Sequence, residues 1–458
     1  MRTNTLSAVF RQLVSLRFAK LSLVALTTVL FLSLFAAAQA VAAPQDDPVT
    51  VIVQTDSHDS LVRRVSVGGT VSGLEALELS GLDIITTTTG FGLAVCSIAG
   101  AGCPADDCFC NLGVWTYSYW DGASWQTHLT GAADSTVTPG AIDGWRWSPT
   151  WGDAPLPAPR LIAAASALDW LATRQSADNG SYGDSAGASI EMLMGVGANQ
   201  VRAMDWHTDT ATPSLAAFLM GAGPDFTEKG PAFAGKFAVA ATAGDLCLPQ
   251  SAATPADYYV PGVGYSTDAG FAAWAMLGAA ALEEPIPADA VTALAGMAFP
   301  SGGWEWQSTF GADTNTTALA IQALVAAGQP TSTTEIQNGL AFLETGQNAD
   351  GGFTYDPASA FGTDSDADST AYVVQALIAA GEDPSAARWT EGGNTAIDYL
   401  LASQLPDGSL EWQIGTGANQ LATQQAIPAL LGESFPLTVT PARLCANLGL
   451  PALSHEQP

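Results

Sequence analysis

The sequence predicts a multidomain α+β protein in which a small β-rich domain precedes a closed double ring of helices, an α/α toroid. Three observations lead to this prediction. A helix-turn-helix unit recurs along the second part of the chain, several helices are apolar on every face, and short β-branched and aromatic runs fill the first part. A supersecondary unit that recurs in this way is typical of repeat architectures.

The first helix of the recurring unit ends in a fixed pattern. An aromatic residue and Leu precede a Gln, and a Gly turn with an apolar residue follows. The pattern stands at residues 342–353, 170–182 and 399–412. Gly suits such turns because it adopts backbone conformations that other residues avoid.

The second helix of the unit also repeats. The stretch from Asp313 to Gly328 aligns without a gap with the stretch from Asp366 to Gly381. The Asp at the front can cap free N–H groups of a helix, and the Gly at the back suits a left-handed cap. Because the body is apolar on nearly every face, we expect this helix to be buried on all sides and its partner to lie outside.

These patterns predict about six inner and six outer helices over residues 160–458. The inner helices are expected to begin near Asp184, Pro213, Asp268, Asp313, Asp366 and Ala418. The outer helices are expected near 160–175, 228–244, 286–298, 332–346, 388–404 and 438–450.

Residues 44–151 are expected to form the β-rich domain. Val114–Trp120, the turn at Asp121-Gly122 and Trp125 have the strand-turn-strand pattern of a hairpin. Three prolines then fall within residues 152–159, which predicts a linker between the two domains.

Charge excludes one class of function. The chain carries 14 Lys and Arg against 44 Asp and Glu, a net charge of −30, so it has no basic footprint for nucleic acid. The same balance argues against binding to anionic lipid surfaces.

Residues 1–42 are predicted to be a signal peptide, because basic residues precede a long apolar run that ends in small residues. The alternative is an uncleaved signal anchor, since the run is long enough to span a bilayer. Either way the protein is expected to be secreted or displayed on the cell surface, and a membrane contact is expected only through such an anchor.

Six cysteines follow this segment, and an even count in an exported protein suggests disulfides. Four of them lie close together, so the simplest prediction is two local bridges and one long-range bridge, Cys247–Cys445. The cysteines of the local cluster are Cys96, Cys103, Cys108 and Cys110. A zinc site there is disfavoured because no His stands at ligand spacing, and no metal is expected.

The aromatic-Leu, Gln and Gly-turn pattern resembles the repeats of prenyltransferases and squalene cyclases over roughly residues 160–450. The resemblance implies an α/α toroid. It leaves activity open, because non-catalytic proteins of the transcobalamin group share the ring, so function is argued from the site.

The β-rich part is similar to the small domain of transcobalamin and intrinsic factor. The similarity lies in Gly90-Phe91-Gly92, the Trp115–Trp120 strand with its turn, and the ending from Pro139 to Trp145. The insertion at Cys96–Cys110 departs from that pattern. This resemblance implies cobalamin as a candidate ligand, held between ring and β-domain.

The most charged candidate site contains Asp364, Asp366 and Asp368. The residues are interpreted first as caps and a solvated loop. Calcium is a second interpretation, but the EF-hand pattern fails. A third follows from the cyclase resemblance, in which an Asp of a D-x-D-D-T-A motif protonates an alkene. Asp366 to Ala371 keeps that motif except for Ser369, so Asp368 is the candidate acid.

The leading hypothesis is an exported, non-catalytic binding protein for cobalamin or another amphipathic small molecule. One alternative is an isoprenoid cyclase that uses Asp368, with Asp366 beside it, and another is a surface adhesion module. The oligomeric state is left open. The expected ligand-binding residues are Asp268, Asp313, Asp366, Asp368, Thr370, Gln375, Trp304, Tyr355, Trp115 and Trp120.

Overall fold

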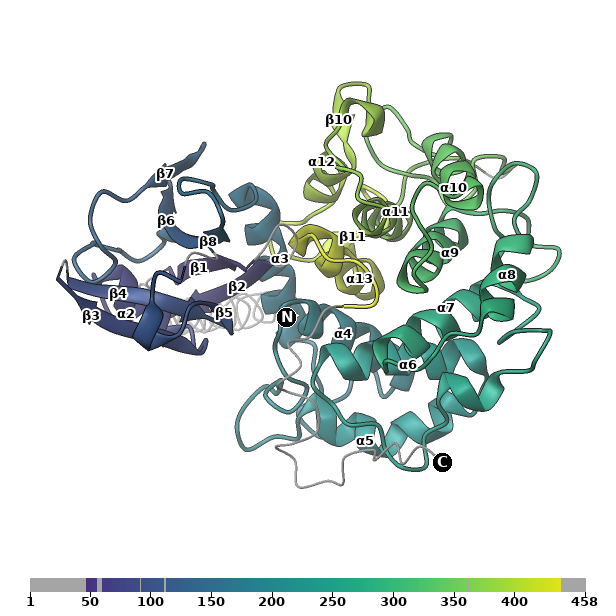
Figure 1. Cartoon of the computed structure of the whole chain (residues 1–458), viewed down its shortest axis with the longest axis horizontal. Helices are drawn as coiled ribbons and strands as arrows, with labels where there is room; N and C mark the ends of the chain where they lie inside the picture. The colour runs from purple at the N-terminus through teal and green to yellow at the C-terminus, as the bar shows by residue number, and fades with distance from the viewer. Residues whose placement is uncertain (1–46, 56–59, 91, 111–112, 361, 438–458) are drawn as a thin grey trace, which may run out of the picture. The chain divides into compact units, whose positions relative to one another are not determined.

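The computed structural model describes residues 47–437, except 56–59, 91, 111–112 and 361 (Figure 1). The predicted signal peptide, the outer helix at 438–450 and the partner expected for Cys247 therefore lie outside the described residues. Mixed helices and small sheets are present, as the predicted fold class requires.

The β-rich part contains two sheets. A five-stranded sheet has the order β2-β1-β8-β6-β7, in which only the β1–β8 pair is parallel, and a three-stranded antiparallel sheet has the order β3-β4-β5. The strands are β1 (Val49–Gln54), β2 (Ser60–Val65), β3 (Ile84–Thr89), β4 (Gly92–Ile98), β5 (Ala101–Gly102), β6 (Val114–Trp120), β7 (Trp125–Thr127) and β8 (Ile142–Ser148).

Helix α2 (Gly73–Leu79) packs on this core. Its N-cap Ser72 accepts a hydrogen bond from the Glu75 N–H, and Leu74 and Leu77 are buried among the valines of β1. A short 3-10 turn, η1 (Ala105–Asp107), lies in the cysteine-rich loop. Cys96 pairs with Cys108, and Cys103 pairs with Cys110. The local bridges are therefore confirmed, and Cys247 is also disulfide-bonded.

The helical part is a ring. Six helices contact one another in the cyclic order α4-α6-α7-α9-α11-α13, and α13 returns to α4 (Figure 1). These inner helices are α4 (Ala186–Ala198), α6 (Pro231–Ala243), α7 (Ala269–Ala281), α9 (Thr314–Ala326), α11 (Ala367–Ala379) and α13 (Gln420–Leu431). Nearly all their apolar residues are buried, which agrees with the predicted burial on every side.

The outer helices each pack on one or two inner ones. They are α3 (Ala158–Ala172), α5 (Leu215–Thr227), α8 (Ala288–Gly296), α10 (Thr334–Glu344) and α12 (Ala396–Ala402). Short 3-10 turns and two-residue ladders join them: η2 (Pro255–Tyr258), η3 (Ala387–Trp389), β9 (Thr390–Glu391), β10 (Asn394–Thr395), β11 (Leu410–Glu411) and β12 (Ala418–Asn419). Helix α3 begins inside the predicted linker.

One pair of helices was assigned wrongly. The helix near Pro213 was expected inside and 228–244 outside, whereas α5 is outer and α6 is inner. The reason is close packing: a Cβ at Gly235 of α6 would lie 2.0 Å from the Trp274 carbonyl oxygen, so the backbones of α6 and α7 touch. Helix α5 instead leaves Asp225 in solvent.

The repeat Gln joins neighbouring units. The Nε2 of Gln347 donates to the carbonyl oxygen of Gly351 in its own turn (3.0 Å) and to that of Trp389 in the next unit (2.9 Å). Gln175 and Gln404 each make the same two kinds of contact. One side chain thus fixes both the turn and the register of adjacent units.

Candidate active site

The first Asp of each repeated second helix is a cap. At the start of α11, Asp366 accepts hydrogen bonds from the Ser369 N–H (2.7 Å) and hydroxyl (2.8 Å). At the start of α9, Asp313 accepts the same pair from Thr316, at 2.7 and 2.8 Å. Burial raises the pKa of Asp313 to about 6 and also raises that of Asp366, against the effect of these hydrogen bonds.

Asp368 differs from both caps. It lies in the first turn of α11, and its Oδ1 is buried with no hydrogen-bond partner among the described residues. Burial, followed by the nearby charges of Asp366 and Glu191, raises the pKa of Asp368 to about 7. The carboxyl therefore holds a proton in a good part of the molecules at neutral pH. Asn315 occupies the equivalent position of α9.

A pocket of about 620 Å³ opens at the N-terminal halves of the inner helices. Its walls come from α4, α5, α6, α7, α13 and the loop before α9, and they are mainly apolar. The larger wall residues are Glu191, Phe226, Phe233, Lys236, Trp274 and Trp306. A volume of this size suits a small organic molecule.

Glu191 connects the pocket to Asp368. Its carboxylate lines the pocket, pairs with the Lys236 ammonium group and accepts a hydrogen bond from Gln425 (3.1 Å). Lys236 also lies 5.1 Å from the centre of the Trp274 ring. Since Glu191 acts electrostatically on Asp368, the acid and the pocket share one region of the ring.

Sequence reasoning missed Glu191 and Lys236. A signal was present, because Glu191 is the one ionisable residue of α4 and Lys236 is the one ionisable residue of α6. Charged residues are rarely buried without a partner, so two lone opposite charges on apolar helices predict a pair.

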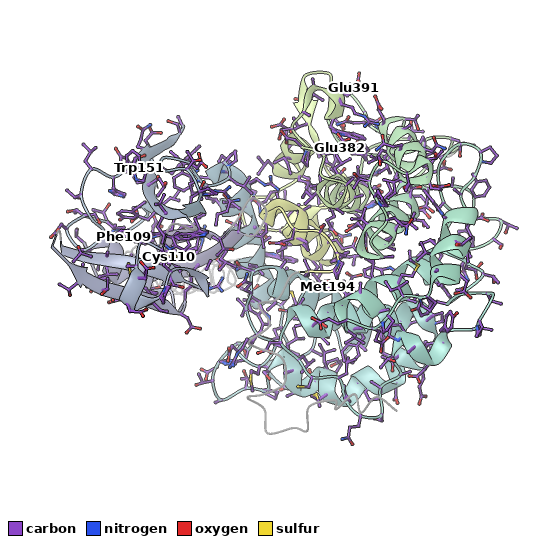
Figure 2. All side chains as sticks on the ribbon, viewed as in Figure 1. Phe109, Cys110, Trp151, Met194, Glu382 and Glu391 are labelled. Atoms are coloured by element: carbon purple, nitrogen blue, oxygen red, sulfur yellow. A yellow bond between two sulfur atoms is a disulfide. The ribbon has the colours of Figure 1, made fainter. Side chains whose placement is uncertain are left out.

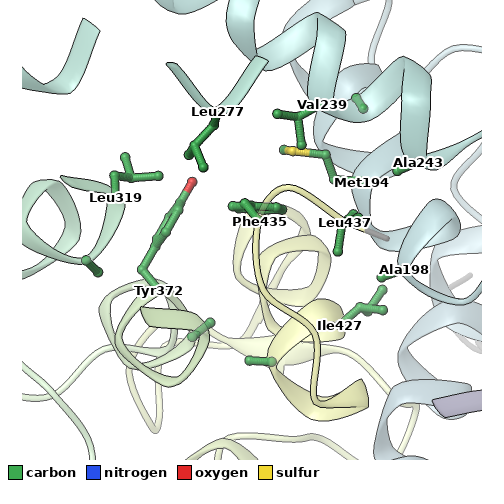
Figure 3. Close-up of a cluster of buried hydrophobic side chains, with 14 of the residues drawn as sticks. Met194, Ala198, Val239, Ala243, Leu277, Leu319, Tyr372, Ile427, Phe435 and Leu437 are labelled. Atoms are coloured by element: carbon green, nitrogen blue, oxygen red, sulfur yellow. The ribbon is translucent and has the colours of Figure 1, made fainter. Parts of the chain in front are cut away.

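Buried apolar side chains fill the interior of the ring from the middle of the inner helices toward their C-terminal ends (Figure 3). Tyr372, one turn after Asp368, lies there with Leu277, Leu319 and Phe435. The Phe435 N–H donates to the Gln322 Oε1 at 2.8 Å. Phe435 also packs on Trp274, with ring centres 5.4 Å apart, so it supports one wall of the pocket.

The other predicted site residues are scattered. Asp268 accepts a hydrogen bond from the Ser308 N–H. The hydroxyl group of Thr370 accepts a hydrogen bond from the Phe353 N–H. Tyr355 is exposed and lies beside Asp313. Trp304 is fully buried, and its indole donates to the Leu294 carbonyl oxygen (2.8 Å). Gln375 is buried, and its Oε1 has no hydrogen-bond partner in the part of the chain that the structure describes. Trp115 and Trp120 lie on β6. Asp366 and Asp368 thus lie close together at the start of α11. The predicted aromatic site residues do not gather into one site: Trp304, Tyr355, Trp115 and Trp120.

Within residues 47–437 as described, no group of three or more His, Cys, Asp or Glu side chains is placed to hold a metal ion. In the same part of the chain, every helix is too short or too polar to cross a membrane.

Residues 283–421 match the family model described as the squalene-hopene cyclase C-terminal domain. The matched segment includes Asp366 and Asp368. No curated protein matches the sequence.

Several solved structures resemble this chain, but only weakly. The type II terpene cyclase MstE from Scytonema is 14% identical, covers 60% of this chain and 98% of its own, and has a TM-score of 0.40. A polysaccharide lyase is 10% identical, with coverage of 60% and 96% and a TM-score of 0.42. The ent-copalyl diphosphate synthase from Streptomyces platensis is 18% identical, with coverage of 54% and 50% and a TM-score of 0.36. Such scores carry no argument about activity.

The family match overturns the leading hypothesis. A non-catalytic binding protein for cobalamin was expected, and an enzyme was disfavoured, but residues 283–421 match an enzyme domain. The match favours the alternative of a cyclase-type enzyme, and it lends no support to the adhesion module.

Proposed function

We propose that this protein is an enzyme of the isoprenoid-cyclase type, in which Asp368 protonates an alkene of a linear isoprenoid. The observation that carries the proposal is the state of Asp368. It is a buried carboxyl with a pKa raised to about 7 and an oxygen that has no hydrogen-bond partner among the described residues, and it lies within the segment that matches a cyclase domain. A general acid works best when its pKa lies near the working pH.

The proposed reaction involves no oxidation or reduction. The O–H bond of Asp368 breaks as a C–H bond forms on the alkene, which leaves a carbocation that another double bond attacks. The cyclised cation then loses a proton to water at the mouth of the pocket, and Asp368 regains a proton from solvent, so the net conversion is an isomerisation. The N-terminus of α11 stabilises the carboxylate left on Asp368, since helix N-termini favour negative charge.

The pocket walls suit the cationic stage. Trp306 presents an aromatic ring to the pocket, and the face of such a ring attracts a cation. Apolar walls also keep water from trapping the carbocation early.

Ser369 replaces the last Asp of the D-x-D-D-T-A pattern. Its hydroxyl donates to Asp366 at 2.8 Å, so it holds the cap instead of adding another negative charge beside Asp368. A further carboxylate at this position would raise the pKa of Asp368 more. Ser369 therefore keeps the pKa of Asp368 nearer to neutral pH.

The test is a turnover assay with squalene, farnesol and geranylgeraniol, read by gas chromatography and mass spectrometry. Asp368→Asn should lower the rate of cyclisation at least about 100-fold, because the amide cannot donate an acidic proton. Asp225→Asn, an exposed carboxylate on α5, is the matched control and should leave the rate unchanged. Cyclisation at equal rates in Asp368→Asn, or none by the native protein with any of the three, rejects the proposal.

Two earlier expectations are kept within this proposal. Residues 1–42 direct export, and the β-rich part is a domain of the transcobalamin type. The bridges Cys96–Cys108 and Cys103–Cys110 support export, because disulfides persist in oxidising compartments. Sequencing the N-terminus of the protein recovered outside the cytoplasm tests the first point, and a start at residue 1 would contradict cleavage.

A further inference from the structure

A second pocket, of about 320 Å³, lies wholly within the β-rich part. Its floor is the aromatic face of two paired strands: Trp115 and Tyr117 of β6 stand opposite Trp147 and Trp145 of β8. Alternate residues of a strand share one face, so the four rings form one surface. The Trp115 and Trp147 ring centres are 5.3 Å apart, and those of Tyr117 and Trp145 are 4.4 Å apart.

Two exposed aromatic residues stand at the rim. Phe109 is 65% exposed and Trp151 is 70% exposed, and both line the pocket (Figure 2). Phe109 lies between Cys108 and Cys110, each of which is bound to another cysteine. The two bridges therefore restrain the backbone on both sides of Phe109, which lowers the entropy lost when its ring contacts a ligand.

The chemistry of the wall limits the ligand. None of the residues that line the pocket is charged, so it offers no ionic partner to an anion or a cation. The indole N–H of Trp145 is buried and has no acceptor among the described residues. A hydrocarbon on this open surface would keep much of its area in water. A sugar ring places its apolar C–H face on the aromatic floor and keeps its hydroxyl groups hydrated.

We propose that this aromatic pocket of the β-rich part binds a neutral pyranose sugar. The site is separate from the pocket near Asp368, and the proposal does not rest on cyclase activity. It uses the stacking surface of Trp115 and Trp147 as the floor and Phe109 and Trp151 as the rim.

The test uses the full chain on an array of neutral oligosaccharides, followed by calorimetric titration with the best binder. Trp151→Ala and Phe109→Ala should each weaken binding about tenfold or more, since each removes a stacking ring. Both side chains are exposed, so their loss leaves the core intact. Phe310→Ala, equally exposed at 67% but on the ring, is the matched control and should bind as the native chain does.

Three results overturn the proposal: binding to no oligosaccharide, binding that both rim variants retain, or binding of a proline-rich peptide or of squalene in place of sugars. Cyclisation measured in the same variants separates the two sites. Trp151→Ala should bind sugar more weakly and keep the native rate of cyclisation. Asp368→Asn should keep sugar binding and lose cyclisation.

Discussion

Asp368 owes its properties to its neighbours. The carboxyl is held in the first turn of α11 by the cap at Asp366, and burial together with the charges of Asp366 and Glu191 favours its protonated form. The same burial that prepares an acid is a cost to the fold whenever the acid ionises. Both effects give measurable pH dependences.

The rate of cyclisation should fall as the pH rises through about 7, because the protonated fraction of Asp368 falls there. Glu191→Gln removes one of the negative charges that raise the pKa of Asp368, and it also leaves the positive charge of Lys236 unpaired. Each of these two effects lowers the pKa of Asp368. The fall in rate should therefore move to lower pH, by about half a unit to one unit. The pH–rate profiles of the native chain, Glu191→Gln and Asp225→Asn check this, and an unmoved profile in Glu191→Gln would contradict it.

Asp368→Asn should stabilise the protein at pH 8. The folded pKa of Asp368 lies near 7, above an unfolded value of about 4, so its favourable contribution is complete below that unfolded value and is lost as the pH rises to the folded one. Asn avoids the buried charge, and the gain at pH 8 should be roughly 1–3 kcal/mol. Urea unfolding of both proteins at pH 4 and pH 8 measures it. A gain of the same size at both pH values would exclude ionisation as the cause.

At the scale of the element, the repeat depends on glycines in the turns, where the backbone of the next unit passes very close. Gly351 has a φ of +86°, and a Cβ there would lie 2.2 Å from the Thr395 carbonyl oxygen. Gly180 and Gly408 meet backbone oxygens in the same way. The turn of one unit thus sits directly against the chain of the next.

Gly351→Ala should cost roughly 3 kcal/mol or more, because both the backbone conformation and the contact with Thr395 are disturbed. Gly328→Ala is the matched control. Its φ is +79° with nothing within 4 Å of a Cβ, so only the conformational cost of about 1 kcal/mol is expected. Urea unfolding compares the two, and equal losses would show that the close approach contributes nothing.

Local signals predicted much of this structure and part of the site. Rules that act within a few residues predict the helix caps at Asp313 and Asp366 and the turn glycines. These features were recognisable because they recur along the chain. The role of Gln347 was not visible, because its second acceptor, Trp389, lies far along the chain. The pocket near Glu191 depends on several helices at once, and no short stretch of sequence encodes that arrangement.

At the scale of the whole molecule, charge is the dominant constraint. The net charge of −30 is carried by a chain in which Lys and Arg are scarce, so most carboxylates have no basic partner to offset them. Such self-repulsion opposes the compact state and is screened by salt.

The melting temperature should therefore rise by a few degrees when NaCl is raised from about 10 mM to about 500 mM at pH 7.5. Differential scanning calorimetry measures this, and sodium perchlorate at equal ionic strength separates screening from salting-out. A melting temperature that falls or stays level in both salts would show that repulsion does not limit stability.

Phe435 and Leu437 close the interior of the ring behind Trp274. The interior of the ring behind the Glu191 pocket is therefore filled by apolar side chains, so under the proposed function we expect reactant and product to pass through the same mouth of the pocket. A long flexible isoprenoid would enter end first, and the compact, stiffer product would leave by the same route before the next reactant arrives. We therefore expect release of the product, rather than bond formation, to limit the rate of the proposed cyclisation.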